Sequence, residues 1–354
     1  MTFERLRLRD ERGRMKDERA WASAKRGSCF RLHPSSFLRG IAALCIAVAS
    51  AGAMSQDYPT RPVRLITGSP GSTSDISARF IAQKLSERWG QQVVVDNRPG
   101  AGGIIGAEIG AVAAPDGHTL TVGHIGTHAS AQFLFKKLPY DPVKDFAPLS
   151  LMTNSGIALA VHPSIPARDL REFVAFAKAK PGGLNYGSAG GGTSSQLSGE
   201  LFNQMTGAKL VHIPYKGAGF ALTALVSGET QAAFLSTTTL SVQARAGKVR
   251  PLAVLSEKRF SAAPDIPSAV EAGFPGLDSS VWFGLFAPAK TPRSIVTRIN
   301  RDVVAALQLP EAKAALLSQG AEAVPTTPEE FERFLKSEID KWGRVIKEAG
   351  IKAN

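Results

Sequence analysis

Short apolar, β-branched runs alternate along the chain with longer stretches in which apolar residues recur at helical spacing. In the first series, the runs at 63–66, 93–95 and 119–122 predict strands, and the stretches at 76–89 and 104–113 predict helices. Strands that alternate with helices in this way form parallel sheets, so the series predicts one α/β unit.

A second series with the same alternation begins near residue 184. It predicts helices at 195–205, 220–227 and 240–246, and strands at 184–186, 209–213, 232–235 and 252–255. Two more apolar extended runs, 157–161 and 281–286, stand on either side of this series. We expect these two runs to be strands that connect two α/β units.

The C-terminal part predicts two helices, at 292–307 and at 328–349. Before the second helix, Thr327 with Glu330 three residues later matches a capping box. The acidic residues of this helix, Glu338 among them, are expected on its solvated face.

The length and charge of the chain limit its class. With 354 residues, 44% of them apolar, it is long enough for two domains of ordinary size. The net charge of +12 is uneven, because residues 1–53 hold 11 of the 42 Lys and Arg and only 5 of the 30 Asp and Glu. The rest has an excess of six basic residues, scattered among acids. A nucleic-acid binder needs a clustered basic face, so we expect no nucleic-acid partner.

Residues 1–53 have the features of an extension that ends in an export signal. Arg39 precedes the apolar run 41–50, and Ala51-Gly52-Ala53 matches the cleavage pattern of a signal peptidase. A membrane anchor is the alternative, but even when extended to Met54 the run has 14 residues, fewer than the roughly 18 that a spanning helix needs. We therefore expect cleavage after Ala53 and a periplasmic mature protein.

Two loops rich in Gly, Ser and Thr each follow a predicted strand and precede a predicted helix. They are GSPGSTSD at 68–75 and GSAGGGTSS at 187–195. Helix N-termini offer unpaired backbone N–H groups, and glycines let a ligand approach the backbone closely. Ligands of open α/β sheets bind beyond the carboxyl ends of the strands, where both loops fall. One loop alone could simply cap its helix, but the pair predicts a shared anion site.

Known nucleotide and hydrolase motifs are incomplete in this chain. The glycine-rich segment 97–106 has Ile105 where a dinucleotide-binding motif needs glycine. Neither a P-loop nor a G-x-S-x-G nucleophile elbow occurs after residue 53. The sequence therefore predicts no catalytic residues.

His124 and His128 have the i, i+4 spacing of a metal-binding pair. Gly126 between them disfavours a regular helix, and no acidic residue or Cys stands close by in the sequence. We therefore interpret the two histidines as parts of a loop with satisfied side chains, and we expect no metal and no cofactor.

Six motifs are spread over the chain after residue 57. They are VDNRPGAGG at 95–103, PDGHTL at 115–120, LPYDP at 138–142, DF at 145–146, IPYKG at 213–217 and KW at 341–342. Together they resemble the substrate-binding receptors of the tripartite tricarboxylate transporter family, also called Bug-type receptors. The resemblance covers nearly all of the part that we expect to be exported.

The resemblance implies a type II periplasmic-binding fold, with two α/β domains, a ligand cleft between them and two crossover strands. Domain 1 would be discontinuous and hold residues 58–158 and 282–354, and domain 2 would hold residues 159–281. Such a receptor closes on a carboxylate by hinge bending and holds it through backbone amides and hydroxyls.

The two loops and the resemblance together supply the candidate ligand-binding residues. They are Ser69, Gly71, Ser72, Thr73, Asp75, Thr127, Ser188, Gly191, Gly192, Thr193, Ser194, Lys216 and Ser236. For Asp75, capping of the first helix is the alternative to ligand contact. Many relatives have an acidic or small residue after the position of Phe234, whereas this chain has Leu235-Ser236, so we expect a ligand without an amino group.

We therefore expect a monomeric, non-enzymatic periplasmic receptor that delivers a small carboxylate to a tripartite tricarboxylate-type membrane permease. Two other functions stay open. A ligand sensor for a membrane kinase would look the same in sequence. A secreted α/β hydrolase would need a nucleophile with a base within reach.

Overall fold

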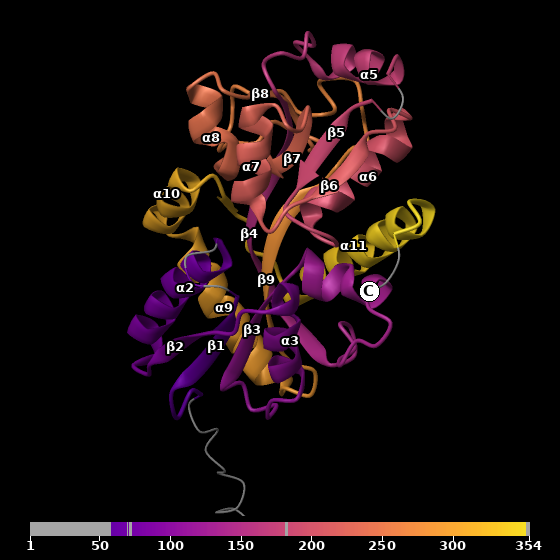
Figure 1. The fold of residues 1–354 in the computed structure, drawn as a ribbon. Helices are drawn as coiled ribbons and strands as arrows, with labels where there is room; N and C mark the ends of the chain where they lie inside the picture. The colour runs from indigo at the N-terminus through magenta and orange to yellow at the C-terminus, as the bar shows by residue number, and fades with distance from the viewer. Residues whose placement is uncertain (1–57, 69, 71–72, 181–182, 352–354) are drawn as a thin grey trace, which may run out of the picture. The chain divides into compact units, whose positions relative to one another are not determined.

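The computed structural model describes residues 58–68, 70, 73–180 and 183–351 (Figure 1). All of these residues belong to one compact unit. Its alternating strands and helices confirm the predicted α/β class. The predicted export signal and its cleavage site lie outside the described residues. Within the described part, no helix is both long and apolar enough to cross a membrane.

Ten strands in the described part of the chain form one continuous sheet. They are β1 (Val63–Thr67), β2 (Val93–Asn97), β3 (Thr119–His124), β4 (Phe146–Val161), β5 (Asn185–Ser188), β6 (Val211–Pro214), β7 (Ala232–Ser236), β8 (Arg250–Val254), β9 (Ser280–Pro288) and β10 (Glu322–Ala323). The order is β2-β1-β3-β9-β4-β7-β5-β6, and β8 and β10 pair with β4.

The long strand β4 takes part in two halves of this sheet. Its residues 146–156 pair antiparallel with β9, which also pairs antiparallel with β3, beside the parallel strands β1 and β2. Its residues 157–161 pair antiparallel with β7 and β8, and β5 lies parallel to both β7 and β6. We call these the first and second half of the sheet. The predicted domain boundaries near residues 158 and 282 stay a prediction.

Helices of eight or more residues cover both faces of the sheet. They are α2 (Thr73–Trp89), α3 (Ile104–Ala111), α5 (Leu170–Lys178), α6 (Ser194–Thr206), α7 (Ala218–Ser227), α8 (Thr237–Arg245), α9 (Arg293–Gln308), α10 (Pro310–Ser318) and α11 (Pro328–Glu348). Shorter segments are the 3₁₀ turn η1 (Ala101–Gly103), the π-helical turn η2 (Ile125–Ala129) and α4 (Ala131–Leu134). Helix α11 begins at the predicted capping box, in which Thr327 and Glu330 bond reciprocally.

The first half of the sheet is buried on both faces. Strand β1 shows why, because four of its five residues are buried, as expected for a parallel strand covered by helices on each side. Ile81 of α2 and Ile299 of α9 share one apolar cluster with Leu65, whereas Ile104 of α3 belongs to another. This packing fixes the carboxyl ends of β1 and β3, where the loops toward α2 and η2 begin.

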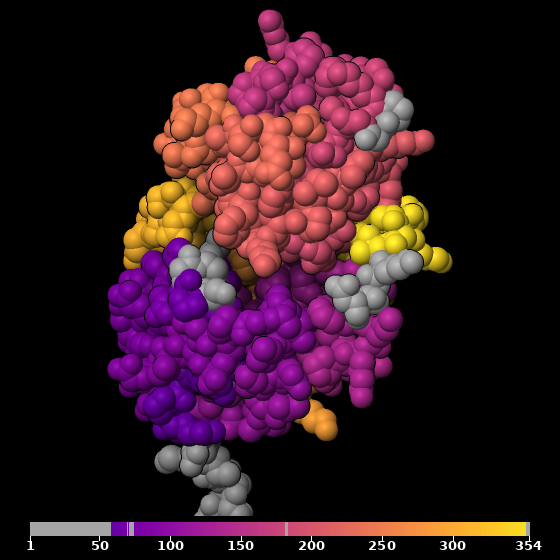
Figure 2. Space-filling view, in the orientation of Figure 1, coloured from indigo at the N-terminus to yellow at the C-terminus, as the bar shows by residue number. Residues whose placement is uncertain are grey.

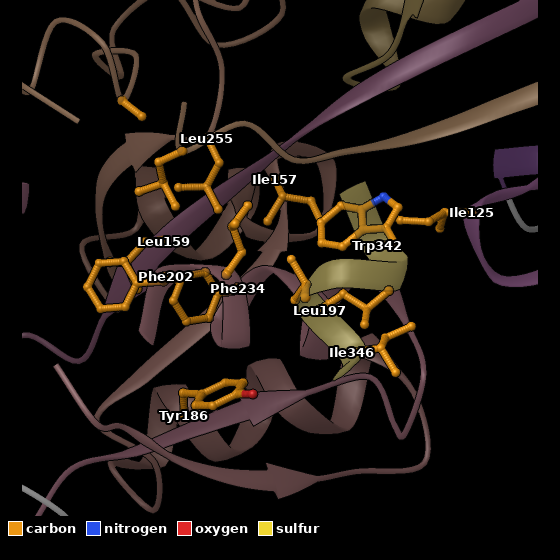
Figure 3. Packing of buried hydrophobic residues seen from close by; sticks show 14 of the residues in the cluster. Ile125, Ile157, Leu159, Tyr186, Leu197, Phe202, Phe234, Leu255, Trp342 and Ile346 are labelled. Carbon is orange, nitrogen blue, oxygen red and sulfur yellow. The ribbon is translucent and has the colours of Figure 1, made fainter. Parts of the chain in front are cut away.

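Helix α11 packs against elements of both halves of the sheet. Trp342 and Ile346 of this helix belong to the same buried cluster as Leu197 of α6 and Ile157 of β4 (Figure 3). A hydrogen bond of 2.8 Å from Gln204 Nε2 of α6 to the Val345 carbonyl adds a polar contact. The C-terminal helix is therefore part of the main core.

The expectation that Glu338 lies on a solvated face is wrong. Its side chain is buried, with 4% exposed. Glu338 Oε2 accepts hydrogen bonds of 2.8 Å from the indole nitrogens of Trp282 on β9 and of Trp342 on α11, and Oε1 forms an ion pair with Lys341. The helix predicted for this segment is correct. Glu338 nevertheless lies on the buried face of α11, where two indole N–H donors stabilise its carboxylate.

The sequence did not predict α5, α10 or the first part of β4. The segment 146–156 contains Pro148 and Gly156 together with hydroxyl side chains, which weaken a strand pattern. In the structure Ser150 and Thr153 are buried within this strand. Packing on both sides stabilises an extended segment that its composition does not favour.

Candidate functional site

A cavity of about 940 Å³ lies at the carboxyl ends of β1 and β3. Its wall is formed by the end of β1, the segment 98–103, the beginning of η2, the loop 189–194 before α6, and residues of β6 and β9. Figure 2 shows the surface hollowed where the purple residues of the first half of the sheet meet the salmon residues around α7. The cavity therefore combines residues from both halves of the sheet.

The N-terminal ends of three helices contribute to the cavity wall. Ser74 belongs to the first turn of α2, Gly106 and Ala107 to the first turn of α3, and Ser194 to the first turn of α6. First-turn N–H groups have no partner within their own helix, and the helix dipole places partial positive charge there. The arrangement favours a negatively charged ligand group.

The loop before α6 is held by its own hydrogen bonds. Thr193 caps the helix, and its hydroxyl also donates to the Gly190 carbonyl at 2.7 Å. The Gly192 N–H donates to Gln196 Oε1 at 2.7 Å. A Cβ on Gly191 would meet no atom within 4 Å. Gly191 therefore lets the backbone border the open cavity, in a loop whose shape the flanking residues fix.

Gly192 differs from Gly191 in its backbone. Its φ is +74°, in the left-handed region that favours glycine, and a Cβ there would lie 2.7 Å from Leu134 Cδ1. A side chain at Gly192 would therefore strain the loop, whereas a side chain at Gly191 would extend into open space at the cavity wall.

The segment 98–103 faces this loop from the first half of the sheet. The imidazole of His124 holds this segment in place. Its Nδ1 accepts the Gly126 N–H at 3.0 Å, and the ring also forms a hydrogen bond with the backbone of Gly102. Burial lowers the pKa of His124 to about 4. At neutral pH His124 is therefore uncharged and supports the backbone rather than offering a cation to a ligand.

His128, one turn further along, is fully buried. It stacks on Phe286 with ring centroids 4.0 Å apart, and its Nδ1 lies 2.9 Å from Thr127 Oγ1. Burial, and secondly the nearby His124, lowers the pKa of His128 to about 3. In the described part of the chain no group of three His, Cys, Asp or Glu side chains could hold a metal ion.

Asp75 belongs to a polar network at the start of α2 rather than to the cavity wall. Its carboxylate accepts hydrogen bonds from Asn97 Nδ2 at 2.8 Å and from Arg79 Nε at 3.0 Å. Asn97 also donates to the Gly68 carbonyl at 2.9 Å. This network links the end of β2 to the loop that follows β1.

The structure brings five of the sequence-predicted site residues to the cavity wall. They are Thr127, Gly191, Gly192, Thr193 and Ser194. Ser69, Gly71 and Ser72 lie outside the described residues, as does the side chain of Thr73, the first residue of α2.

Three other candidates lie away from the lining. Ser188 is buried directly behind the loop before α6. Lys216 is exposed, and Ser236 caps α8 by accepting the Thr239 N–H at 3.2 Å. Ligand contact by any of the candidates stays a prediction.

Other residues that line the cavity are not among those predicted from the sequence: the segment 98–103, His124 and His212. In the sequence the segment is an incomplete dinucleotide motif and part of a family motif, and neither pattern shows that it lines a cavity. His212 directly precedes the IPYKG motif at 213–217, which was the available signal. A single histidine next to a motif does not show which way its ring points.

An α/β fold with a cavity bordered by helix N-termini is typical of proteins that bind small anionic molecules. Comparisons with known proteins specify the class. Residues 77–351 match the profile of the family described as "Tripartite tricarboxylate transporter family receptor". Protein BugT of Bordetella pertussis is 34% identical over 320 residues, which cover 89% of this chain and 98% of that protein.

Solved structures agree with this result. The R. palustris protein Rpa4515 with adipate superimposes with a TM-score of 0.74 at 36% identity, covering 84% of this chain and all of the other. MatC from Rhodopseudomonas palustris with bound malate has a TM-score of 0.69 at 36% identity, covering 82% and 100%. The chain belongs to the tripartite tricarboxylate transporter receptor family. This is a family of periplasmic solute-binding receptors and not of enzymes.

Proposed function

We propose that this protein is a periplasmic receptor that captures a small carboxylate in the cavity and delivers it to a tripartite tricarboxylate-type permease. The observation that carries the proposal is the convergence of the helix N-termini of α2, α3 and α6 on one cavity. Backbone N–H groups at such ends bind carboxylates without requiring a charged side chain. Adipate and malate in two solved relatives support a carboxylate as ligand class.

The rest of the lining suits the carbon skeleton of such a ligand. Val122 comes from β3, Phe283 from β9, and Leu134 and Phe135 from α4 and the residue that follows it. Ligand sites commonly combine a largely apolar wall with a few polar groups that fix orientation. We expect a monomer that needs no cofactor.

Ligand capture should also bring the two halves of the sheet closer together. A carboxylate that bonds both to the loop 191–194 and to the first turns of α2 or α3 contacts both halves only in a closed state. It therefore stabilises that state. Small-angle scattering should show a smaller radius of gyration with saturating ligand, and an unchanged radius would contradict closure.

Hydrolysis is the competing function, and one pair of residues could suggest it. Ser188 Oγ lies 2.6 Å from His212 Nε2. Ser188 has no exposed surface, however, and its hydroxyl is also bonded to the Gly190 backbone, so a substrate carbonyl cannot reach it. Steady turnover of a carboxylic ester that is lost in Ser188→Ala would favour a hydrolase.

A thermal-shift screen tests the proposed function directly. The purified protein is heated with a series of carboxylic acids and with the corresponding amides, which have similar shape and no charge. A carboxylate at a hundred times its Kd should stabilise the protein by ~2.7 kcal/mol. The amides should leave the melting temperature unchanged. If no carboxylate raises it, the proposed function is wrong.

A further inference from the structure

The cavity wall contains a histidine that the proposed function does not yet use. His212 on β6 is half-buried and lines the cavity. Its ring lies against Tyr186 with centroids 5.1 Å apart, and its Nε2 lies 2.6 Å from Ser188 Oγ. These two contacts hold the ring in a defined orientation beside the loop 189–194.

The neighbouring hydrogen bonds indicate where the ring carries its hydrogen. Ser188 Oγ accepts the Gly190 N–H at 3.1 Å. It lies 3.2 Å from the Gly190 carbonyl, which already accepts the Thr193 hydroxyl at 2.7 Å. The Ser188 hydroxyl can donate to this carbonyl or to His212 Nε2, and we assign the hydrogen to the shorter contact, the one of 2.6 Å to His212 Nε2. A neutral imidazole that accepts at one nitrogen carries its hydrogen on the other, so Nδ1 is the donor.

Nδ1 of His212 is accessible. No hydrogen bond joins it to another described residue, and it is not among the buried side-chain nitrogens that lack a partner, such as Nε2 of His128. Since His212 lines the cavity, an N–H donor on Nδ1 is available to a group bound there.

We propose that His212 binds the ligand carboxylate through Nδ1–H and takes up a proton when the ligand binds. This inference rests on the proposed function. The proton comes from solvent and adds to Nε2, and the Ser188 hydroxyl turns from Nε2 to the Gly190 carbonyl. Ser188 then accepts the new N–H. The network thus accommodates both charge states of the ring without moving the loop.

The surroundings explain why the ligand would change the protonation of His212. Burial lowers the pKa of His212 in the free protein, which keeps the ring neutral near pH 7. Around it, Tyr186 has its hydroxyl 2.6 Å from Glu200, and Arg98 and His124 line the same cavity. A carboxylate against the ring favours its charged form and raises its pKa.

Isothermal titration calorimetry with malate and adipate as probes tests this inference. Titrations at several values between pH 6 and pH 8, in buffers of different ionisation enthalpy, give the Kd and the number of protons taken up. Simple carboxylates stay largely ionised in this range. The wild-type protein should take up a fraction of one proton and bind more tightly toward pH 6. The change in Kd should approach about tenfold for each pKa unit between bound and free His212.

Two variants isolate the contribution of the ring. His212→Gln keeps an N–H donor but does not titrate, so it should bind with an affinity that does not change with pH and without proton uptake. His162→Gln is the matched control, because His162 Nδ1 also lies 2.7 Å from a serine, Ser164, but outside the cavity lining. It should behave like the wild-type protein.

The wild-type titrations decide the matter even if His212→Gln fails to fold. Tight binding of a probe without proton uptake would overturn the role of His212 and leave carboxylate capture standing. Equal pH dependence in His212→Gln and wild type would also overturn it. If neither probe binds at any pH, the proposed function fails and this inference fails with it.

Discussion

Replacement of Glu338 should reveal how strongly one buried carboxylate stabilises the core. Glu338→Ala removes the acceptor of two indole N–H groups, those of Trp282 and Trp342, each 2.8 Å from Oε2. A buried donor left without a partner costs about 1–3 kcal/mol. The variant also removes the partner of Lys341, although that ammonium stays 3.7 Å from Asp278. We expect a loss of about 4 kcal/mol in the free energy of unfolding, in line with other broken buried pairs.

Glu338→Gln should be much milder. An amide oxygen can still accept from both indoles, but the bonds lose their charge-assisted part and Lys341 loses its counterion. Hydrogen bonds to charged groups contribute about 1 kcal/mol more than neutral ones, so we expect a loss of about 2 kcal/mol. Glu332→Ala, an exposed position on the same helix, is the control and should stay within about 0.5 kcal/mol of wild type.

Urea unfolding followed by circular dichroism measures these differences, with indole fluorescence as a second probe. Coincidence of the two curves shows that one transition is being measured. A Glu338→Ala variant within about 1 kcal/mol of wild type would refute the reasoning, because the two indoles would then have found other partners.

Four further changes have defined outcomes. Gly191→Val should weaken carboxylate binding at least tenfold with an unchanged melting temperature, because its side chain adds bulk in open space at the cavity wall, and normal affinity by calorimetry would contradict this. Gly192→Ala should instead lower stability by about 1–2 kcal/mol in urea unfolding, since its φ is positive. Asp75→Ala should cost about 2 kcal/mol in the same assay but weaken binding less than Gly191→Val, because its partners Asn97 and Arg79 stabilise the loop. The pKa of His128 is near 6.5 in the unfolded chain and about 3 in the folded protein. The free energy of unfolding therefore falls as the pH drops below 6.5, by up to about 1.4 kcal/mol per pH unit. His128→Phe should show a shallower fall in melting temperature between pH 6 and pH 4, and an identical fall would contradict the role of His128.

The order of the elements could be predicted from the sequence because the strand runs and helical stretches have distinct periods. Thr327 and Glu330 even located the start of α11. The long strand β4 was only half recognised, since Pro148 and buried hydroxyl residues obscure its first part. Glu338 was misplaced because a carboxylate on the buried face can be recognised only from its partner Trp282, which stands 56 residues earlier.

The candidate site was predicted in part. The glycines and hydroxyl residues of the loop 187–195 signal a helix N-terminus, and that loop does border the cavity. The sequence could not show that the segment 98–103 and His212 face the same space, because their positions depend on strand order. Nor could it show that the Asp75 carboxylate accepts hydrogen bonds from Asn97 and Arg79, since this network forms only when β1, β2 and α2 are packed together.

A crystal structure of the protein with the carboxylate that binds most tightly would test the central claim most directly. We expect a carboxylate oxygen within about 2.7–3.2 Å of backbone N–H groups in the loop 191–194 and at the first turn of α2 or α3. Val122 and Phe283 should contact the carbon skeleton. A carboxylate that points into solvent, or a ligand bound away from this cavity, would contradict the account.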